Sequence, residues 1–230
     1  MSKLDCALVF GSNGGIGSSI FKTLKEKKYY QKVYGFSRDH TPKFDITSDK
    51  EIKNLSEKIL DNDLNIKLIV NAIGFLHDEK YFPEKKAEEI NQDYMKKSFE
   101  VNSIFTALLI KYFAPIMPKV ETSIFASLSA RVGSISDNYL GGWYSYRASK
   151  AALNQIMKTA SVEYKRKNKN IIFISIHPGT VATKLSKPFS EKKSLFSTDQ
   201  AALKIIDLFD NLTIENSGQL IDYKNEEIPF

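Results

Sequence analysis

The stretch LVFGSNGGIGSSIFKTL (residues 8–24) joins an apolar run to a helical pattern through a glycine-rich turn. Residues 4–10 predict a buried strand, and residues 15–27 predict a helix. Glycines between the two permit a tight bend, a close backbone approach to a pyrophosphate and close packing of the helix on a sheet. Free N–H groups at the start of the helix add positive potential for phosphates. An ordinary glycine-rich connection is the alternative, but the position directly after the first strand favours dinucleotide binding.

The spacing of the glycines defines the predicted phosphate site. They fall at positions 11, 15 and 17, which gives the pattern G-x-x-x-G-x-G with Gly14 as an extra. The residues expected to surround the phosphates are Gly11, Ser12, Asn13, Gly15, Ile16 and Gly17.

Short apolar runs alternate with helical patterns along the whole chain. Further strands are predicted at 32–36, 66–72, 122–128, 171–176 and 219–221, and further helices at about 48–60, 83–92, 94–117, 144–166 and 199–209. Ser48 and Glu51 predict a capping box. The alternation predicts an α/β fold: a three-layer, doubly wound, Rossmann-like parallel sheet of about seven strands with helices on both faces. Residues 1–230 contain no repeat or linker and are predicted to form one domain.

Composition narrows the function classes. The 230 residues are 42% hydrophobic and 26% charged, as in ordinary globular proteins. We find no run of roughly 18 apolar residues and no secretion signal, and Cys6 is the only cysteine. We therefore expect a cytoplasmic protein without a membrane association. The net charge of +6 comes from lysines spread over predicted helix ends without interleaved aromatic residues, which favours a solvated surface over nucleic-acid binding.

The end of the second predicted strand bears on the choice of cofactor. It reads Gly35-Phe36-Ser37-Arg38-Asp39, and in a doubly wound fold this strand end lies beside the adenosine ribose. Ser37 and Arg38 suit a 2′-phosphate, because a guanidinium makes paired charge-assisted bonds to phosphate. Asp39 is the competing feature, since a carboxylate would bind the ribose hydroxyls of NAD. NADP(H) is favoured over NAD(H).

Tyr146 and Lys150 are the candidate proton-transfer pair. They lie four residues apart in a predicted helix and therefore on one face, one turn from each other. A free phenol has a pKa of about 10, and a neighbouring ammonium group would lower it toward a useful range. Alone, this spacing is common by chance in helices.

Seven sequence elements occur together in order. They are GSNGGIG (11–17), FDIT (44–47), NAIG (71–74), VN (101–102), LSARVGSI (128–135), YRASK (146–150) and HPGTVAT (177–183). Over almost the whole chain this set resembles the short-chain dehydrogenase/reductase family in its compact single-domain form. The segment SLSARVGSISDNYLGGWYSYRASKAAL (127–153) is similar to the branch that contains C-factor-type cell-signalling proteins and sniffer-type carbonyl reductases.

The resemblance implies a role for each matching residue. Tyr146 would be the general acid in carbonyl reduction and the base in alcohol oxidation. Lys150 would hold the nicotinamide ribose and lower the phenol pKa, and Asn102 would anchor a water that links Lys150 to solvent. The other implied cofactor contacts are Asp45, Ile46, Asn71, Ala72, Gly74, Pro178, Gly179, Val181 and Thr183. Each of these residues also has a structural interpretation. Asn102 could be a polar residue hydrogen-bonded inside a helix, Asp45 could cap the local turn, and Pro178-Gly179 could simply end a strand.

The sequence departs from the family pattern at one position. The family carries a catalytic serine as the second residue of a Ser-Ser-x-x-Gly run, and the run here reads Ser129-Ala130-Arg131-Val132-Gly133. On a regular strand Ser129 would face the other way, but a bulge after Leu128 would turn it inward. We predict that Ser129 substitutes for the missing hydroxyl, with Ser134 as a more distant candidate.

The remaining features concern substrate, metal and assembly. Residues 184–197 lie where family members carry a lid, and its expected apolar contacts are Phe189, Leu195, Phe196 and, beside it, Trp143. They predict a small or medium carbonyl or alcohol substrate with apolar character.

No metal is expected, because His40, His77 and His177 lack partners at ligand spacing. The resemblance implies a homodimer or homotetramer through the helices at 94–117 and 144–166.

Three functions follow from these features. The first is NADP(H)-dependent interconversion of a carbonyl and an alcohol. The second, motivated by Ala130, is a cofactor-binding signalling module with weak or no chemistry. Nucleic-acid binding through the basic surface ranks last.

Overall fold

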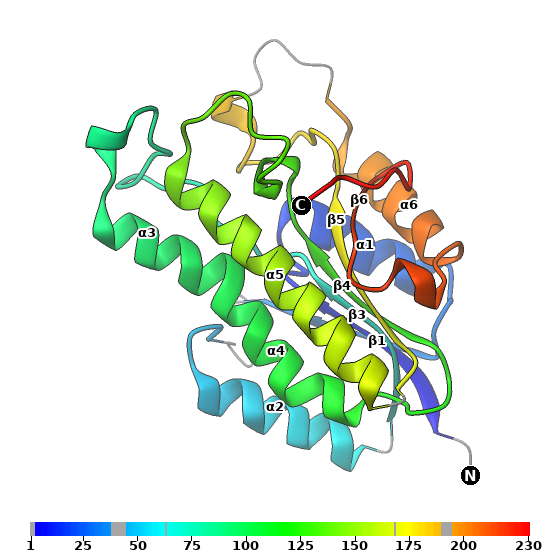
Figure 1. The fold of residues 1–230 in the computed structure, drawn as a ribbon. Helices are drawn as coiled ribbons and strands as arrows, with labels where there is room; N and C mark the ends of the chain where they lie inside the picture. The colour runs from blue at the N-terminus through cyan, green and yellow to red at the C-terminus, as the bar shows by residue number, and fades with distance from the viewer. Residues whose placement is uncertain (1–2, 38–44, 63, 168, 190–194) are drawn as a thin grey trace.

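The computed structural model describes residues 3–37, 45–62, 64–167, 169–189 and 195–230. Within them the chain forms one parallel sheet with the strand order β2-β1-β3-β4-β5-β6 (Figure 1). The strands are β1 (Leu4–Phe10), β2 (Lys32–Phe36), β3 (Leu64–Asn71), β4 (Ser123–Leu128), β5 (Ile171–His177) and β6 (Leu220–Asp222). The doubly wound fold is confirmed, with six strands in the described residues where about seven were expected.

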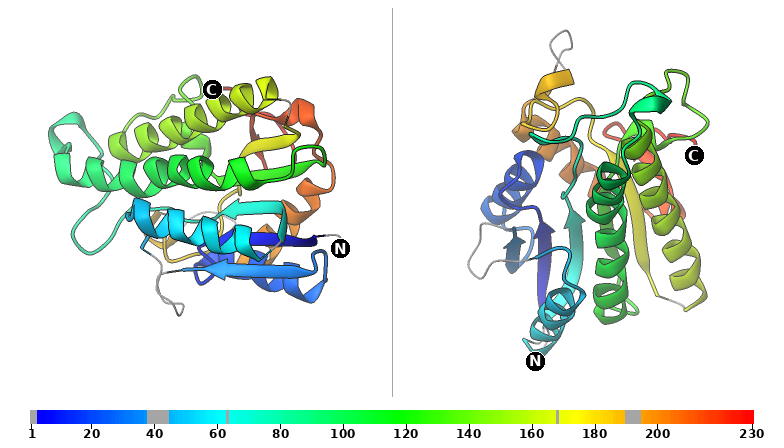
Figure 2. Two further views of the ribbon diagram at one scale, coloured as in Figure 1. Left: turned by 90° about the horizontal axis from the view of Figure 1, so that it is seen from below. Right: turned by 90° about the vertical axis from the view of Figure 1, so that its left-hand side faces the viewer.

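Helices cover both faces of the sheet. They are α1 (Gly15–Glu26), α2 (Asp49–Asp61), α3 (Gln92–Phe99), α4 (Phe105–Phe113), α5 (Tyr144–Arg166) and α6 (Thr198–Phe209). Figures 1 and 2 show α2, α4 and α5 on one face and α1 with α6 on the other. Two separate apolar clusters fill the spaces between the sheet and these two layers.

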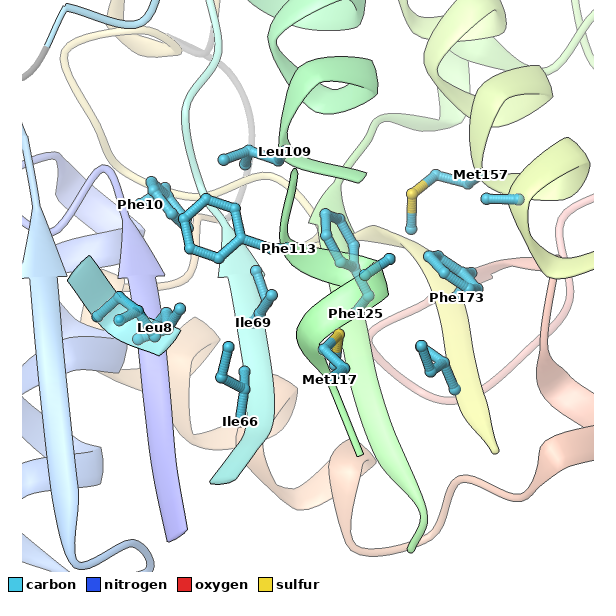
Figure 3. Packing of buried hydrophobic residues seen from close by; sticks show 14 of the residues in the cluster. Leu8, Phe10, Ile66, Ile69, Leu109, Phe113, Met117, Phe125, Met157 and Phe173 are labelled. Carbon is cyan, nitrogen blue, oxygen red and sulfur yellow. The ribbon is translucent and has the colours of Figure 1, made fainter. Parts of the chain in front are cut away.

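The strands are apolar on both sides because each side meets a helix layer. On the α4 and α5 side, Phe10, Phe105, Phe113 and Phe125 are all 0% exposed. Figure 3 shows the packing of Phe10, Phe113 and Phe125. Full burial of one such ring contributes about 1.5–3 kcal/mol relative to leaving it in water. This cluster anchors α4 and α5, the helices that border the site described below.

Strand order places the functional edge. The chain runs from β1 to β2 on one side and then crosses to β3 on the other, so the order reverses between β1 and β3. In open α/β sheets ligands bind outside the carboxyl ends of the strands at such a reversal. The loops that follow β4 and β5 gather at this same end of the sheet, at the top of Figure 1.

The predicted helix at 83–92 is wrong. This segment contains only a short 3₁₀ turn, Ala87–Glu89, and Glu84 is buried against another part of the chain. Its predicted neighbour begins at Gln92, because the Asn91 side chain accepts hydrogen bonds from the first N–H groups of α3. The buried contact of Glu84 and the cap at Asn91 therefore prevent a helix over 83–92.

Two further local predictions are refined by the structure. The long helix predicted at 94–117 is interrupted by a π-helical turn, Glu100–Ile104, between α3 and α4. Ser48 caps α2 by accepting from the Glu51 N–H, but the Glu51 carboxylate accepts from the Asp45 N–H instead of closing a capping box.

The composite helix Gln92–Ile116 is long and apolar enough to cross a membrane by length and composition alone, although it contains no uninterrupted apolar run of about 18 residues. In the fold it packs on the sheet through Phe105, Leu109 and Phe113, all fully buried. Those contacts are typical of a core helix in a globular domain.

Candidate active site

The glycine-rich turn has the close backbone packing predicted for it. Gly11 has φ +87° and its N–H donates to the Phe36 carbonyl at 2.7 Å. A Cβ added at Gly17 would overlap the Gly11 carbonyl group and lie 3.0 Å from the Ala72 Cβ. Among the described residues, no side chain caps the N-terminus of α1, whose cap residue is Gly14. The first N–H groups of this helix are therefore available to an anion.

Other predicted cofactor residues meet this turn. A Cβ on Gly15 would lie 2.7 Å from the Thr183 methyl carbon, and one on Gly11 would lie 3.1 Å from the Ala72 carbonyl carbon. The Ser12 hydroxyl is buried without a hydrogen-bond partner in the structure. An uncapped helix start, close glycine backbone and an unpaired hydroxyl fit the phosphates of a dinucleotide.

The remaining predicted cofactor residues divide into three groups. Arg38 lies outside the described residues, so the 2′-phosphate prediction has no structural test; Ser37 is buried at the end of β2. Asp45 accepts from the Thr47 N–H and hydroxyl, which lowers the pKa of its carboxyl, and Ile46 packs against the core. Asn13, Pro178, Gly179 and Val181 lie in the loops at the carboxyl ends of the strands, and Ile16 lies in the first turn of α1.

The Asn71 side chain is engaged inside the protein. It donates to the Thr106 hydroxyl at 3.0 Å and to the Ser127 hydroxyl at 3.3 Å, and it accepts from the Ile73 N–H at 3.1 Å. These bonds hold the end of β3 against α4 and β4, so its side chain has a structural task at this edge.

Tyr146 and Lys150 lie one turn apart on the buried face of α5. Tyr146 is 7% exposed and Lys150 is 3% exposed. The Lys150 ammonium donates to the Leu128 carbonyl at 2.8 Å and lies 5.9 Å from the centre of the Tyr146 ring. Gly133 lets its loop pack closely against α5 at Lys150, because a Cβ on Gly133 would lie only 2.8 Å from the Lys150 Cβ.

Burial sets the protonation of both groups. It raises the pKa of the Tyr146 phenol above its ordinary value and lowers the pKa of Lys150 to about 8. We expected a lowered phenol pKa, and the net direction is the opposite. Removing either group from water penalises its charged form, and for Tyr146 this effect prevails. Near neutral pH the pair is therefore a protonated phenol beside an ammonium group.

Asn102 joins this pair from the π-helical turn. Its side chain accepts from the Phe75 N–H at 2.7 Å and donates to the Phe75 carbonyl and the Ser149 hydroxyl, both at 2.9 Å. A Cβ on Gly74 would lie 3.6 Å from the Asn102 amide oxygen and 3.7 Å from the Lys150 nitrogen. The structure thus brings Gly74, Asn102 and Lys150 together. The Asn102 amide is also fully hydrogen-bonded inside the protein, as the competing structural interpretation predicted.

The two serine candidates have partners within the protein. The Ser129 hydroxyl donates to the Asn154 amide oxygen at 2.7 Å, two turns along α5 from Tyr146. The Ser134 hydroxyl donates to the Pro229 carbonyl near the C-terminus. Ala130 has an extended backbone and directly precedes the 3₁₀ turn Arg131–Gly133. In the described geometry neither hydroxyl bonds to the phenol.

An aromatic cluster borders Tyr146; it consists of His77, Phe82, Trp143 and Phe189. Ring centres are 6.1 Å apart for Trp143 and Tyr146, 5.0 Å for Trp143 and Phe189, and 5.5 Å for His77 and Phe189. The sequence suggested Trp143 and Phe189 but missed His77 and Phe82, which follow β3. Their signal was the NAIG element directly before them, since it places the start of this loop at the site.

The lid prediction is tested only in part, since residues 190–194 lie outside the described part of the chain. Phe196 packs on Tyr223 with ring centres 4.9 Å apart. Leu195 is half-buried.

A cavity of about 480 Å³ opens beside the ends of β5 and β6. Arg131, Gly179, Phe196 and Asp222 are among its lining residues. His177 also lines it; its Nδ1 is buried without a partner, and burial lowers its pKa to about 4. Among the described residues, no three His, Cys, Asp or Glu side chains gather as a metal-binding group.

Fold and site together define a nucleotide-dependent oxidoreductase: a dinucleotide turn and a buried Tyr–Lys pair lie on one edge of a doubly wound sheet. Residues 20–218 match the family described as "Enoyl-(Acyl carrier protein) reductase". The chain therefore belongs to this short-chain dehydrogenase/enoyl reductase family and is an oxidoreductase of the short-chain dehydrogenase/reductase type.

Two curated relatives show the range of the family. The chain is 28% identical over 178 residues to 1-hydroxy-2-glutathionyl-2-methyl-3-butene dehydrogenase of Rhodococcus sp., covering 77% of this chain and 74% of that protein. It is 29% identical over 136 residues to C-signal of Myxococcus xanthus, covering 59% of this chain and 78% of that protein.

Solved structures confirm the fold. NADPH-bound carbonyl reductase from chicken fatty liver superposes with a TM-score of 0.83 at 22% identity, covering 99% of this chain and 100% of the other. Carbonyl reductase Sniffer of D. melanogaster gives 0.83 at 19% identity, with the same coverage. At such identities the likeness establishes the fold alone.

Proposed function

We propose that this protein is an NADP(H)-dependent oxidoreductase that interconverts a carbonyl and an alcohol, with Tyr146 as general acid and base assisted by Lys150. One observation carries the proposal: a buried phenol and a buried ammonium lie one turn apart at the sheet edge that also holds the glycine-rich turn. The C-terminal edge of a doubly wound sheet is where a dinucleotide binds.

Each residue has a task in this reaction. The bound nicotinamide supplies or accepts the hydride. In reduction, the protonated Tyr146 phenol donates its proton to the oxygen of the carbonyl; in oxidation, the phenolate takes it back. The Lys150 ammonium stabilises the phenolate that donation leaves behind. Asn102 fixes the backbone at Phe75. By the family resemblance it would also hold a water that returns a proton to Lys150.

Backbone rather than side-chain charge would hold the cofactor phosphates. The first N–H groups of α1 and the Gly11–Gly17 turn would bind the pyrophosphate, while Thr183 reaches the same place from the loop after β5. Ser37 and Arg38 support NADP(H) over NAD(H) through the chemistry of their side chains. NADP-bound structural neighbours are consistent with this choice.

Ala130 supports a second candidate function, a cofactor-binding regulatory module with weak chemistry. Loss of one oxyanion-type donor commonly reduces a rate by about 100- to 1,000-fold. Ser129 would have to exchange Asn154 for the substrate to restore that donor. This candidate predicts NADPH binding with a thermal shift and no hydride transfer to any carbonyl.

The test is NADPH and NADH oxidation by the purified protein against a panel of aldehydes, ketones and quinones, with cofactor affinity measured in parallel. The proposal predicts turnover that prefers NADPH and aromatic or otherwise apolar carbonyls, because aromatic rings border Tyr146. Cofactor binding without turnover would favour the regulatory module. No binding of either cofactor would contradict both.

Assembly is a separate proposal. Ile104, Tyr144 and Val162 are exposed apolar residues on the α4 and α5 side of the molecule. We propose that this side pairs with a second copy as a homodimer or homotetramer, which light scattering of the purified protein would test.

A further inference from the structure

The catalytic helix begins without a cap of its own. Its N-cap residue, Trp143, has φ 54° and makes no side-chain cap bond. Tyr146 is the third residue of α5, so the placement of its ring depends directly on how the first turn is held. An uncapped, buried helix start normally requires another partner for its N–H groups.

Glu84 supplies that partner from the loop after β3. Its two carboxylate oxygens accept from the Ser145 N–H at 3.3 and 3.2 Å, and one of them also accepts from the Ser145 hydroxyl. Its main-chain carbonyl accepts from the Trp143 N–H. A Cβ on Gly142 would lie 3.3 Å from that same carbonyl oxygen, so the two loops pack backbone to backbone.

This carboxylate is buried in an unusual way. Glu84 is 2% exposed, and within the described residues its carboxylate forms no ion pair with a lysine or arginine. Burying a carboxylate without a cation is costly. The positive end of α5 and the two Ser145 donors offset that cost, since a helix N-terminus stabilises a negative charge. The stabilisation requires that the first turn of α5 stays against Glu84.

We propose that Glu84 is a positioning residue for Tyr146. It caps the catalytic helix from a distant loop and thereby fixes both the Tyr146 ring and Trp143, the ring that borders it. The inference rests on the proposed function, because it assigns Glu84 to the proton-transfer step. Displacement of a catalytic group by about 1 Å lowers a rate about 100-fold.

The experiment compares Glu84→Ala and Glu84→Gln with Glu88→Gln, a matched carboxylate-to-amide change at an exposed position in the same loop. For each variant, kcat, KM and NADPH affinity are measured, together with the emission of Trp143, the only tryptophan of the chain. Trp143 reports on the start of α5 without any cofactor.

Glu84→Ala is expected to lower kcat by about 10- to 100-fold, shift the Trp143 emission and leave NADPH affinity within about threefold. Glu84→Gln should recover part of this loss, because its amide oxygen accepts one of the two Ser145 donors. Glu88→Gln should behave as the unchanged protein.

Wild-type kcat and Trp143 emission in a folded Glu84→Ala protein would overturn the proposal. A purely structural role would lower thermal stability while kcat per cofactor-binding molecule stays constant, which also overturns it. If Glu84→Ala does not fold, Ser145→Ala removes one donor from the other side, and an unchanged kcat there decides against positioning. Absence of turnover in the wild type counts against the proposed function, whereas the emission of Trp143 still shows whether Glu84 holds the helix.

Discussion

The predicted phosphate turn and the proposed proton-transfer centre share one edge of the sheet but are built in opposite ways. The turn consists of backbone: glycines that lack a Cβ where one would collide, and N–H groups that no side chain caps. The centre consists of the buried side chains of Tyr146, Lys150 and Asn102, and hydrogen bonds to distant parts of the chain hold Lys150 and Asn102 in place. The contrast separates binding from chemistry, so a change in one region should leave the other largely intact.

The largest expected effect is a loss of kcat on substitution in the proposed proton-transfer centre. Tyr146→Phe removes the proton donor and should lower kcat for carbonyl reduction by about 100- to 10,000-fold, the usual contribution of a general acid. NADPH affinity, measured by titration, should stay within about threefold. A Tyr146→Phe protein that retains its turnover would end the assignment of the acid to this phenol.

The next largest expected effect is a loss of NADPH affinity on substitution in the glycine-rich turn. In Gly17→Ala the new methyl group overlaps the Gly11 carbonyl, so the turn must deform. Overpacking of about 1–3 kcal/mol corresponds to a loss of NADPH affinity of about 5- to 150-fold. Gly14→Ala is the control, because its Cβ would lie 3.3 Å from the Gly11 oxygen, a contact that small shifts relieve. Equal affinities in the two variants would contradict the turn as the phosphate site.

A gain of activity is expected at Ala130. Ala130→Ser returns a hydroxyl to the position where the resemblance places the catalytic serine, and a rise in kcat of about tenfold is expected, a fraction of what one such donor contributes. Ser129→Ala is measured beside it. A drop of 100-fold or more in Ser129→Ala, on the order of one lost donor, would show instead that Ser129 is the donor.

The smallest effect is in the pH dependence. Burial lowers the Lys150 pKa to about 8, so Lys150 carries its charge below that pH and loses it above. The rate of carbonyl reduction at pH 8 should therefore be about half its value well below that pH, and it should fall further above pH 8. A pH profile of kcat measures it, with NADPH affinity followed at each pH. A rate that stays level to pH 10 would show that the Lys150 charge is not required.

The same contrast explains what the sequence could predict. Glycine spacing is a local constraint, so the turn, the parallel sheet and the Tyr146–Lys150 spacing were all readable from the chain. Glu84 was not, because its partner Ser145 lies 61 residues away and a buried glutamate has no local signature. That contact also explains why the predicted helix at 83–92 does not form.

The pKa values of Tyr146 and Lys150 also could not be predicted from the sequence, because they depend on burial in the fold. Spacing alone put Lys150 beside Tyr146 and suggested a lowered phenol pKa. Only the packed structure shows that both groups lose water, which raises the Tyr146 pKa and lowers that of Lys150. His77 and Phe82 were missed similarly, because their contacts with Phe189 join loops that follow different strands.

A crystal structure of the protein with bound NADPH tests the central claim most directly. The account predicts the pyrophosphate at the N-terminus of α1 and the nicotinamide ring beside the Tyr146 hydroxyl, with the Lys150 ammonium on the ribose. Phosphates bound away from the Gly11–Gly17 turn, or a phenol directed away from the nicotinamide, would contradict it.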